Sequence, residues 1–280
     1  MPTATDLKRQ IYSLRDLPTL PVVARKILMA VDEDNSSHRS LADVVSRDQA
    51  LAAKVLGLAN SAYYGHRATV RTLSHAIAII GTAMLKQLSL SVFVIQAWGA
   101  RTNPERTRFW KHSIASAHAA AAIARLFGRT PADEAFCAGL LHDIGALVLD
   151  MCFPEEYEEV RGLVKSSEMP LHEAEKQFFE IDHCQAGAWL AEGWQMPEPL
   201  IEAIANHHGT GSDSEGLSEL AGMVRIADLA ASHVDMGLTG EPAASQPVLE
   251  ALGFSETRYL EVIEQLESSR EDIEAFFNLV

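Results

Sequence analysis

Apolar residues recur every three or four positions through most of the chain, which is the spacing of one face of an α-helix. No segment shows the strict alternation of apolar and polar residues that indicates a half-buried strand. The sequence therefore predicts an all-α protein. In the N-terminal half we expect helices at residues 1–16, 22–31, 41–46, 49–60, 73–80 and 83–98, with Asp48 as an N-cap and Gly81 as a break.

The second half of the chain carries the same periodicity in shorter segments. Residues 109–127 are rich in alanine on nearly every face, so neighbouring helices can approach closely and a central position is expected. Further helices are predicted at residues 132–151, 154–165, 170–179, 182–193, 197–207 and 217–234, followed by a Glu-rich amphipathic C-terminal helix. A change of composition near residues 100–104 predicts an N-terminal helical subdomain (1–100), a second helical subdomain (101–240) and a C-terminal helical extension (241–280).

Composition narrows the class of protein. A hydrophobic content of 48% with 22% charged residues is that of an ordinary globular protein. The formal charge of −15 disfavours binding to nucleic acid or an anionic membrane, including a helix-turn-helix function for the N-terminal helix pairs. Three cysteines do not make a disulfide framework, the N-terminus shows no signal segment, and the apolar stretch near residues 88–98 is too short to span a membrane. We therefore expect a soluble, cytoplasmic protein.

The pair His142-Asp143 stands out inside the apolar run of residues 138–149. Burying an imidazole beside a carboxylate costs several kcal/mol unless a metal ion or a full set of hydrogen bonds compensates. Thr130, Pro131 and Asp133 resemble an N-cap, a first helical position and an N3 acid, which places the pair about three turns into one helix spanning residues 132–151.

Other histidines and acids interrupt helical patterns in the same way. Imidazole and carboxylate are ligands for zinc, manganese and iron, and several helices can each direct one ligand into a bundle core. A single such histidine is more often a hydrogen-bonded core residue or a helix-end cap, but several together favour a shared ion. The predicted ligands of one or two divalent ions (Fe, Mn, Zn or Ni) are His112, His142, Asp143, His183, His207, His208 and Asp228. The remaining histidines are expected in loops or on helix faces where solvent can satisfy their hydrogen bonds. They are His38, His66, His75, His118, His172 and His233.

The order of these residues resembles the HD superfamily of metal-dependent phosphohydrolases, and the HD-GYP branch especially. More particular segments resemble an HDOD domain over about residues 15–240; they are Leu17-Pro-Thr-Leu-Pro21, residues 51–65, residues 72–81, Phe109-Trp-Lys-His112-Ser, residues 138–145 and Trp194-Gln-Met-Pro197. The resemblance implies an all-helical bundle in two subdomains, the C-terminal one HD-like, in a bacterial regulatory module without an assigned reaction. Its partner would be a signalling protein or a small phosphate-containing ligand.

Three positions depart from the hydrolase pattern. Ala146 stands where active HD-GYP proteins carry a phosphate-holding lysine, residues 208–216 lack the Gly-Tyr-Pro signature, and Arg108 replaces the glutamate of trimetal members. These departures favour a binding module. The alternative is a metal-dependent phosphohydrolase, in which Asp143 would serve catalysis and Arg108 or Lys111 would hold the phosphate.

A local group of basic residues stands out in this acidic chain. Solvated helix faces are the first interpretation of the group, and contact with a phosphate or nucleotide is the second. Its members are Arg101, Arg106, Arg108, Lys111, Arg125 and Arg129.

Overall fold

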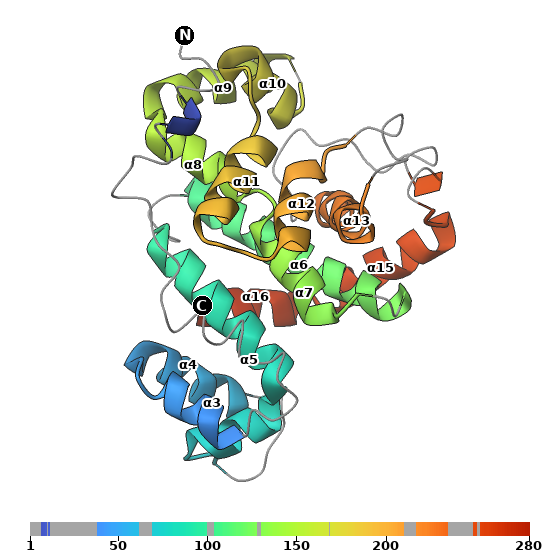
Figure 1. The fold of residues 1–280 in the computed structure, drawn as a ribbon. Helices are drawn as coiled ribbons and strands as arrows, with labels where there is room; N and C mark the ends of the chain where they lie inside the picture. Colours follow the sequence, from blue (N-terminus) through green and yellow to red (C-terminus); the bar gives the residue numbers. More distant parts are fainter. Residues whose placement is uncertain are drawn as a thin grey trace. The chain divides into compact units, whose positions relative to one another are not determined.

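The computed structural model shows a helical protein, drawn in Figure 1. It describes residues 7–9, 11, 38–61, 69–99, 104–127, 130–167, 169–209, 217–234, 249–250 and 253–280. Within these ranges there is no strand, which confirms the predicted all-α class. The helix expected at residues 22–31 and most of the one at 1–16 lie outside the described residues.

The chain forms two compact units. The smaller unit contains the helices α3 (His38–Val45), α4 (Gln49–Ala59), α5 (Leu73–Ala97) and α16 (Arg270–Leu279). The larger unit contains α6 (Pro104–Phe127), α7 (Ala132–Leu141), α8 (Ile144–Cys152), α9 (Pro154–Ser167), α10 (Leu171–Phe179), α11 (His183–Gly193), α12 (Glu198–Asn206), α13 (Glu219–His233) and α15 (Glu256–Ser268).

Local signals determine the helix ends in the smaller unit. The Asp48 side chain accepts a hydrogen bond from the Leu51 backbone N–H at 2.9 Å, so it caps α4 as expected. Gly81 interrupts α5 with φ 82° and ψ 165°, a backbone conformation that residues other than glycine rarely adopt. The Lys54 Nζ atom of α4 donates to the backbone carbonyl of Val280 at 3.1 Å, which ties α16 to this unit.

Helix α6 is the centre of the larger unit, as its alanine content predicts. It packs against α7, α13 and α15, and its alanines from Ala119 to Ala122 are buried. A Cβ at Gly139 of α7 would lie 2.8 Å from the Ser116 carbonyl oxygen of α6. Only glycine therefore permits this crossing, which brings the end of α7 close to the face of α6 that carries His112.

The prediction of a single helix at residues 132–151, with Thr130 as its N-cap, is wrong in two respects. The chain forms α7 and α8 with a turn at His142-Asp143 between them, where Asp143 has φ −93° and ψ 4°. The helix also begins at Ala132, with Pro131 as N-cap and no side-chain cap. A Cβ at Gly145 would overlap the backbone of His183 and Gly187, so α8 and α11 cross at backbone contact. The turn therefore places Asp143 beside the start of α11.

Two apolar segments, Leu73–Ala97 and Ala132–Cys152, are long and apolar enough to cross a membrane by length and composition alone. Most of each apolar window is buried inside the protein, 67% in the first and 83% in the second. Core helices of soluble proteins have this character, and the burial fits a soluble protein.

Candidate metal centre

All seven predicted ligands lie together in the larger unit. His112 comes from α6, His183 begins α11 and Asp228 belongs to α13, while the others occupy the turns after α7 and α12. Each is at most 9% exposed. Residues separated by more than 100 positions in the sequence therefore share one buried polar cluster.

The first group of possible ligand atoms contains His112 Nε2, His142 Nε2, Asp143 Oδ2 and Asp228 Oδ1. The Asp143 oxygen lies 3.5 Å from His112 Nε2 and 3.2 Å from His142 Nε2. The Asp228 oxygen lies 3.2 Å and 3.9 Å from the same two nitrogens. Atoms bound to one ion at about 2.1 Å are roughly 3.0–3.4 Å apart, so this spacing is close to that of a ligand set.

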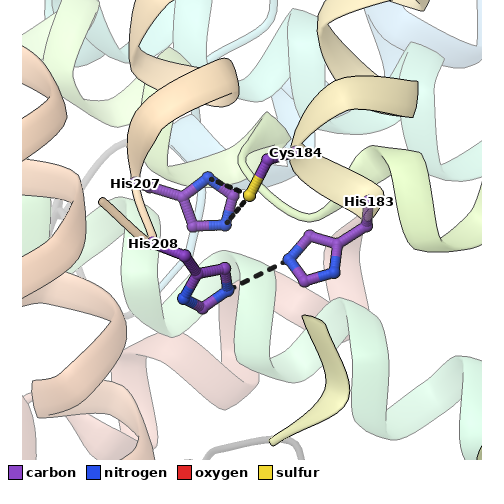
Figure 2. A group of neighbouring side chains, drawn as sticks. All are labelled: His183, Cys184, His207 and His208. Atoms are coloured by element: carbon purple, nitrogen blue, oxygen red, sulfur yellow. Dashed lines mark hydrogen bonds between the residues drawn. The ribbon is translucent and has the colours of Figure 1, made fainter. Parts of the chain in front are cut away.

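The second group gathers around the other oxygen of Asp143. Asp143 Oδ1 lies 3.2 Å from His183 Nε2 and 3.4 Å from His207 Nε2, while His208 Nε2 lies 3.0 Å from His183 Nε2. Figure 2 shows these three rings turned toward one another. Asp143 thus presents one oxygen to each group, which is the position of a carboxylate that bridges two ions.

Cys184 is a member of the cluster that sequence reasoning missed. Its sulfur lies 3.7 Å from Nδ1 and 3.8 Å from Nε2 of His207, and it joins His183, His207 and His208 within ligand spacing (Figure 2). Burial raises the pKa of the Cys184 thiol, but His207 and His183 outweigh this effect and lower it. Its place directly after His183 in an otherwise apolar helix was the available signal.

Glu175 of α10 was also missed, although it is fully buried. Its Oε2 atom accepts from the His183 backbone N–H at 2.8 Å and lies 2.6 Å from His183 Nδ1. The hydroxyl of Tyr157 donates to the other oxygen at 2.7 Å. A carboxylate on Nδ1 fixes the ring and leaves Nε2 facing the cluster, as carboxylates do for metal-bound histidines.

Backbone carbonyls orient two further rings. Nδ1 of His142 lies 2.8 Å from the Gly139 carbonyl oxygen, and Nδ1 of His207 lies 2.8 Å from that of Ile204. With Nδ1–H donated to these carbonyls, Nε2 is the nitrogen that faces the interior, and it can bind an ion once it carries no proton. Among the described residues, the buried Nε2 of His142 has no hydrogen-bond partner. An ion in the first group would satisfy this atom, so the donor set fits a metal.

The pKa values of several cluster residues are shifted by burial and by the other members of the cluster. Burial lowers the pKa of His112, but Asp143 and Asp228 outweigh it and raise the pKa to about 10. Burial also lowers the pKa of His207, while Cys184 and Asp143 raise it to about 10. For Asp143, burial raises the pKa, and the neighbouring histidines, His142 first, bring it well below its ordinary value. Metal binding must therefore displace protons from His112 and His207.

His208 lies at the edge of the cluster. Arg225 Nη1 approaches its Nδ1 atom at 2.5 Å, and burial together with the nearby cations lowers its pKa well below the ordinary value. With Arg225 donating to Nδ1, neutral His208 carries its proton on Nε2, which lies 3.0 Å from Nε2 of His183. For His208 to bind a metal through Nε2, its proton must move to Nδ1, which requires release of the Arg225 contact. His172, expected in solvent, instead stacks on His208 with ring centroids 4.3 Å apart.

The two cations proposed for phosphate contact lie on α6. Arg108 is exposed one turn before His112 and lines a cavity beside Ala146, whereas Lys111 is half-buried. Arg106 and Arg125 lie on the same helix, while Arg101 and Arg129 lie outside the described residues. The basic group is therefore spread along α6, and Arg106 and Arg108 share the cavity.

Comparison with known proteins places these motifs in a family. The HDOD domain model matches residues 17–210, more than half of the chain. An uncharacterized protein of Treponema pallidum (strain Nichols) is 28% identical over 265 residues, which are 91% of this chain and 50% of that protein. Ribonuclease Y of Bacillus pumilus (strain SAFR-032) is 30% identical over 167 residues, which are 60% of this chain and 24% of the ribonuclease. The chain thus spans half or less of these relatives.

Solved structures share the fold. An HDOD domain protein of unknown function from Geobacter sulfurreducens has a TM-score of 0.81 at 26% identity, over 98% of this chain and 97% of that one. A candidate signal transduction protein from Marinobacter aquaeolei VT8 has a TM-score of 0.80 at 26% identity, over 94% of this chain and 60% of that one. A candidate phosphohydrolase from Shewanella amazonensis SB2B has a TM-score of 0.77 over 99% and 98% of the two chains; at 24% identity it is similar in fold alone.

Proposed function

Because the chain belongs to the HDOD domain family, we propose that it is a regulatory module of bacterial signal transduction. It acts by binding a partner protein or a small ligand, and its larger unit holds one or two divalent ions. The similarity to the candidate signal transduction protein from Marinobacter aquaeolei VT8 supports the regulatory role. This chain spans only 60% of that protein. Any activity of a longer protein that contains this chain is therefore also part of the proposal.

The observation that carries the metal centre is the position of Asp143. Its two oxygens face two separate groups of buried histidine and carboxylate atoms, each at ligand spacing. Two ions bridged in this way would neutralise charges that are otherwise costly to bury. Iron, manganese, zinc and nickel all suit this set, and the Cys184 thiolate favours zinc, iron or nickel over manganese.

A binding role is preferred over catalysis for two reasons. The ligand residues are at most 9% exposed, which leaves little access for a substrate. Ala146, one turn after Asp143, supplies no cation for a phosphate. A cytoplasmic location belongs to the same proposal, because Cys137, Cys152 and Cys184 are all free thiols, as a reducing compartment keeps them.

The second candidate is a metal-dependent phosphohydrolase. A carboxylate between two ligand groups is typical of two-metal hydrolases, and the relative from Bacillus pumilus is named as a ribonuclease. Bound ions would supply an activated water. In that case Asp143 would hold the ions, while Arg108 or Lys111 would bind the phosphate.

Metal content and turnover test both candidates. Protein purified without added metal is analysed by inductively coupled plasma mass spectrometry and then assayed on phosphodiesters and nucleotides with divalent ions present. We expect bound metal and no turnover in the wild type, loss of all ions in Asp143→Ala, and, where the wild type holds two ions, retention of one in Asp228→Ala. Turnover that Asp143→Ala abolishes would establish the hydrolase instead. A wild-type protein without metal affinity would contradict both.

A further inference from the structure

A cavity of about 150 Å³ lies in the larger unit, between α6, α8, α9 and α10. It lies beside the metal cluster, because α6 and the start of α8 carry residues of both. Ala146 and Leu147 in its wall follow Asp143 by about one turn of α8, and Arg108 precedes His112 by one turn of α6. None of the seven candidate metal ligands lines it.

The cavity is locally basic in an acidic protein. Its cations are Arg106 and Arg108 from α6 and Arg161 and Lys165 from α9, against the carboxylates of Glu105 and Asp150. Among the lining residues the positive charges therefore exceed the negative ones by two, or by one when Glu158, which pairs with Arg161, is included, whereas the whole chain carries −15. Low-dielectric walls focus such an excess on an entering anion.

Two of the four cations are already engaged. Asp150 accepts from Arg106 Nη2 at 3.0 Å and from Arg161 Nη1 at 2.8 Å, and Arg161 also contacts Glu158 at 2.7 Å. These pairs hold the two guanidinium groups in fixed positions. Arg108 and Lys165 are exposed, and no ion pair joins either of them to another residue of the described ranges. The charge excess thus resides in side chains that can turn toward a ligand.

The rest of the wall sets the size and polarity of that ligand. Phe109, Leu147, Val164 and Leu171 line the cavity together with the ring of Tyr157. An engineered cavity of about 150 Å³ lined by apolar residues holds one benzene molecule. The space therefore suits one compact apolar group or ring and is too small for a cyclic dinucleotide.

We propose that this cavity binds a small molecule in which a phosphoryl group is joined to a compact apolar group. Arg108 and Lys165 bind the phosphoryl oxygens, with Arg106 and Arg161 behind them, and the apolar group lies against Phe109 and Leu147. Guanidinium and ammonium groups recognise phosphate by charge-assisted hydrogen bonds. The inference rests on the proposed function, because it names the class of small ligand that the regulatory module takes.

The wall of the cavity is connected to the metal centre. Tyr157, which lines the cavity, donates to Glu175, and Glu175 orients His183. A ligand against the Tyr157 ring thus lies two hydrogen bonds from a candidate metal ligand. This connection provides a physical route by which ligand binding in the cavity and metal binding in the cluster can influence each other.

Phenyl phosphate serves as the probe, and binding is measured by isothermal titration calorimetry on the full chain. Inorganic phosphate tests the anionic part alone and phenol tests the apolar part alone. We expect phenyl phosphate to bind more tightly than either and to weaken with rising salt, since surface cations contribute. Absence of phenyl phosphate binding by the wild type would overturn the proposal.

Substitutions place the binding in the cavity. Arg108→Gln and Lys165→Gln should each weaken phenyl phosphate binding about tenfold, the effect of one lost charge-assisted contact. Arg125→Gln is the matched control, because Arg125 is exposed on the same helix about 25 Å away. Unchanged affinity in both cavity variants would also overturn the proposal.

Asp143→Ala separates this proposal from the metal centre. The variant should lose metal and still bind phenyl phosphate, with circular dichroism confirming that it remains folded. If binding disappears in folded Asp143→Ala but persists in the two cavity variants, the probe binds at the ions and the cavity proposal is wrong. If wild-type protein holds no metal and the cavity variants still lose the probe, the cavity proposal stands and the metal centre fails.

Discussion

Glu175→Gln tests whether a buried carboxylate prepares His183 for a metal. The native side chain is fully buried and meets three hydrogen-bonding groups, the closest being His183 Nδ1 at 2.6 Å. Glutamine can retain a hydrogen bond to His183 but removes the negative charge. Loss of such a partner typically lowers metal affinity 10–100-fold, or about 1.4–2.8 kcal/mol. We expect a loss in this range.

Affinity is measured by competition with a chromophoric chelator, at a temperature where circular dichroism shows both proteins folded. Glu173→Gln is the matched control, because Glu173 is exposed on the same helix, and it should leave affinity unchanged. Tyr157→Phe removes one donor and keeps the carboxylate charge, so its effect should be at most a few-fold. Folded Glu175→Gln with wild-type affinity would show that the carboxylate does not prepare this histidine.

Three further predictions concern other parts of the larger unit. Gly145→Ala should destabilise the protein by about 1–3 kcal/mol or more and reduce metal content, because a Cβ there overlaps the backbone of α11. Gly162→Ala on α9, where a Cβ meets nothing within 4 Å, should be neutral or stabilising in the same urea denaturation experiment. Burial, aided by Arg125, lowers the pKa of His118 from 6.5 to about 4, so the unfolded chain takes up a proton first as the pH falls below 6.5. His118→Gln should remove up to about 2 kcal/mol of the stability lost between pH 7 and pH 4.5, and equal losses in both proteins would contradict this. Cobalt-loaded protein should show a thiolate-to-cobalt absorption that Cys184→Ser abolishes, and its persistence in that variant would exclude Cys184 as the ligand.

Much of the fold could be predicted because helical periodicity is local. The spacing of apolar residues, the Asp48 cap and the Gly81 break all act over a few positions, and each is found where expected. The HDOD resemblance is confirmed by the family match over residues 17–210. The error at His142-Asp143 arose because an apolar run does not distinguish one helix from two joined by a tight turn. The two-unit arrangement places α15 and α16 in different units, which periodicity does not determine.

The sequence by itself determined which polar residues would be costly to bury, and the structure brings all seven predicted ligands into one cluster. Their assignment as ligands stays a prediction. Only the tertiary structure decided how the cluster divides around the two oxygens of Asp143 and that Cys184 and Glu175 take part. The reason is that these distances depend on where helices cross, and close contacts at Gly139 and Gly145 set those crossings between residues far apart in the chain. A pattern with a period of three or four residues carries no information about such contacts.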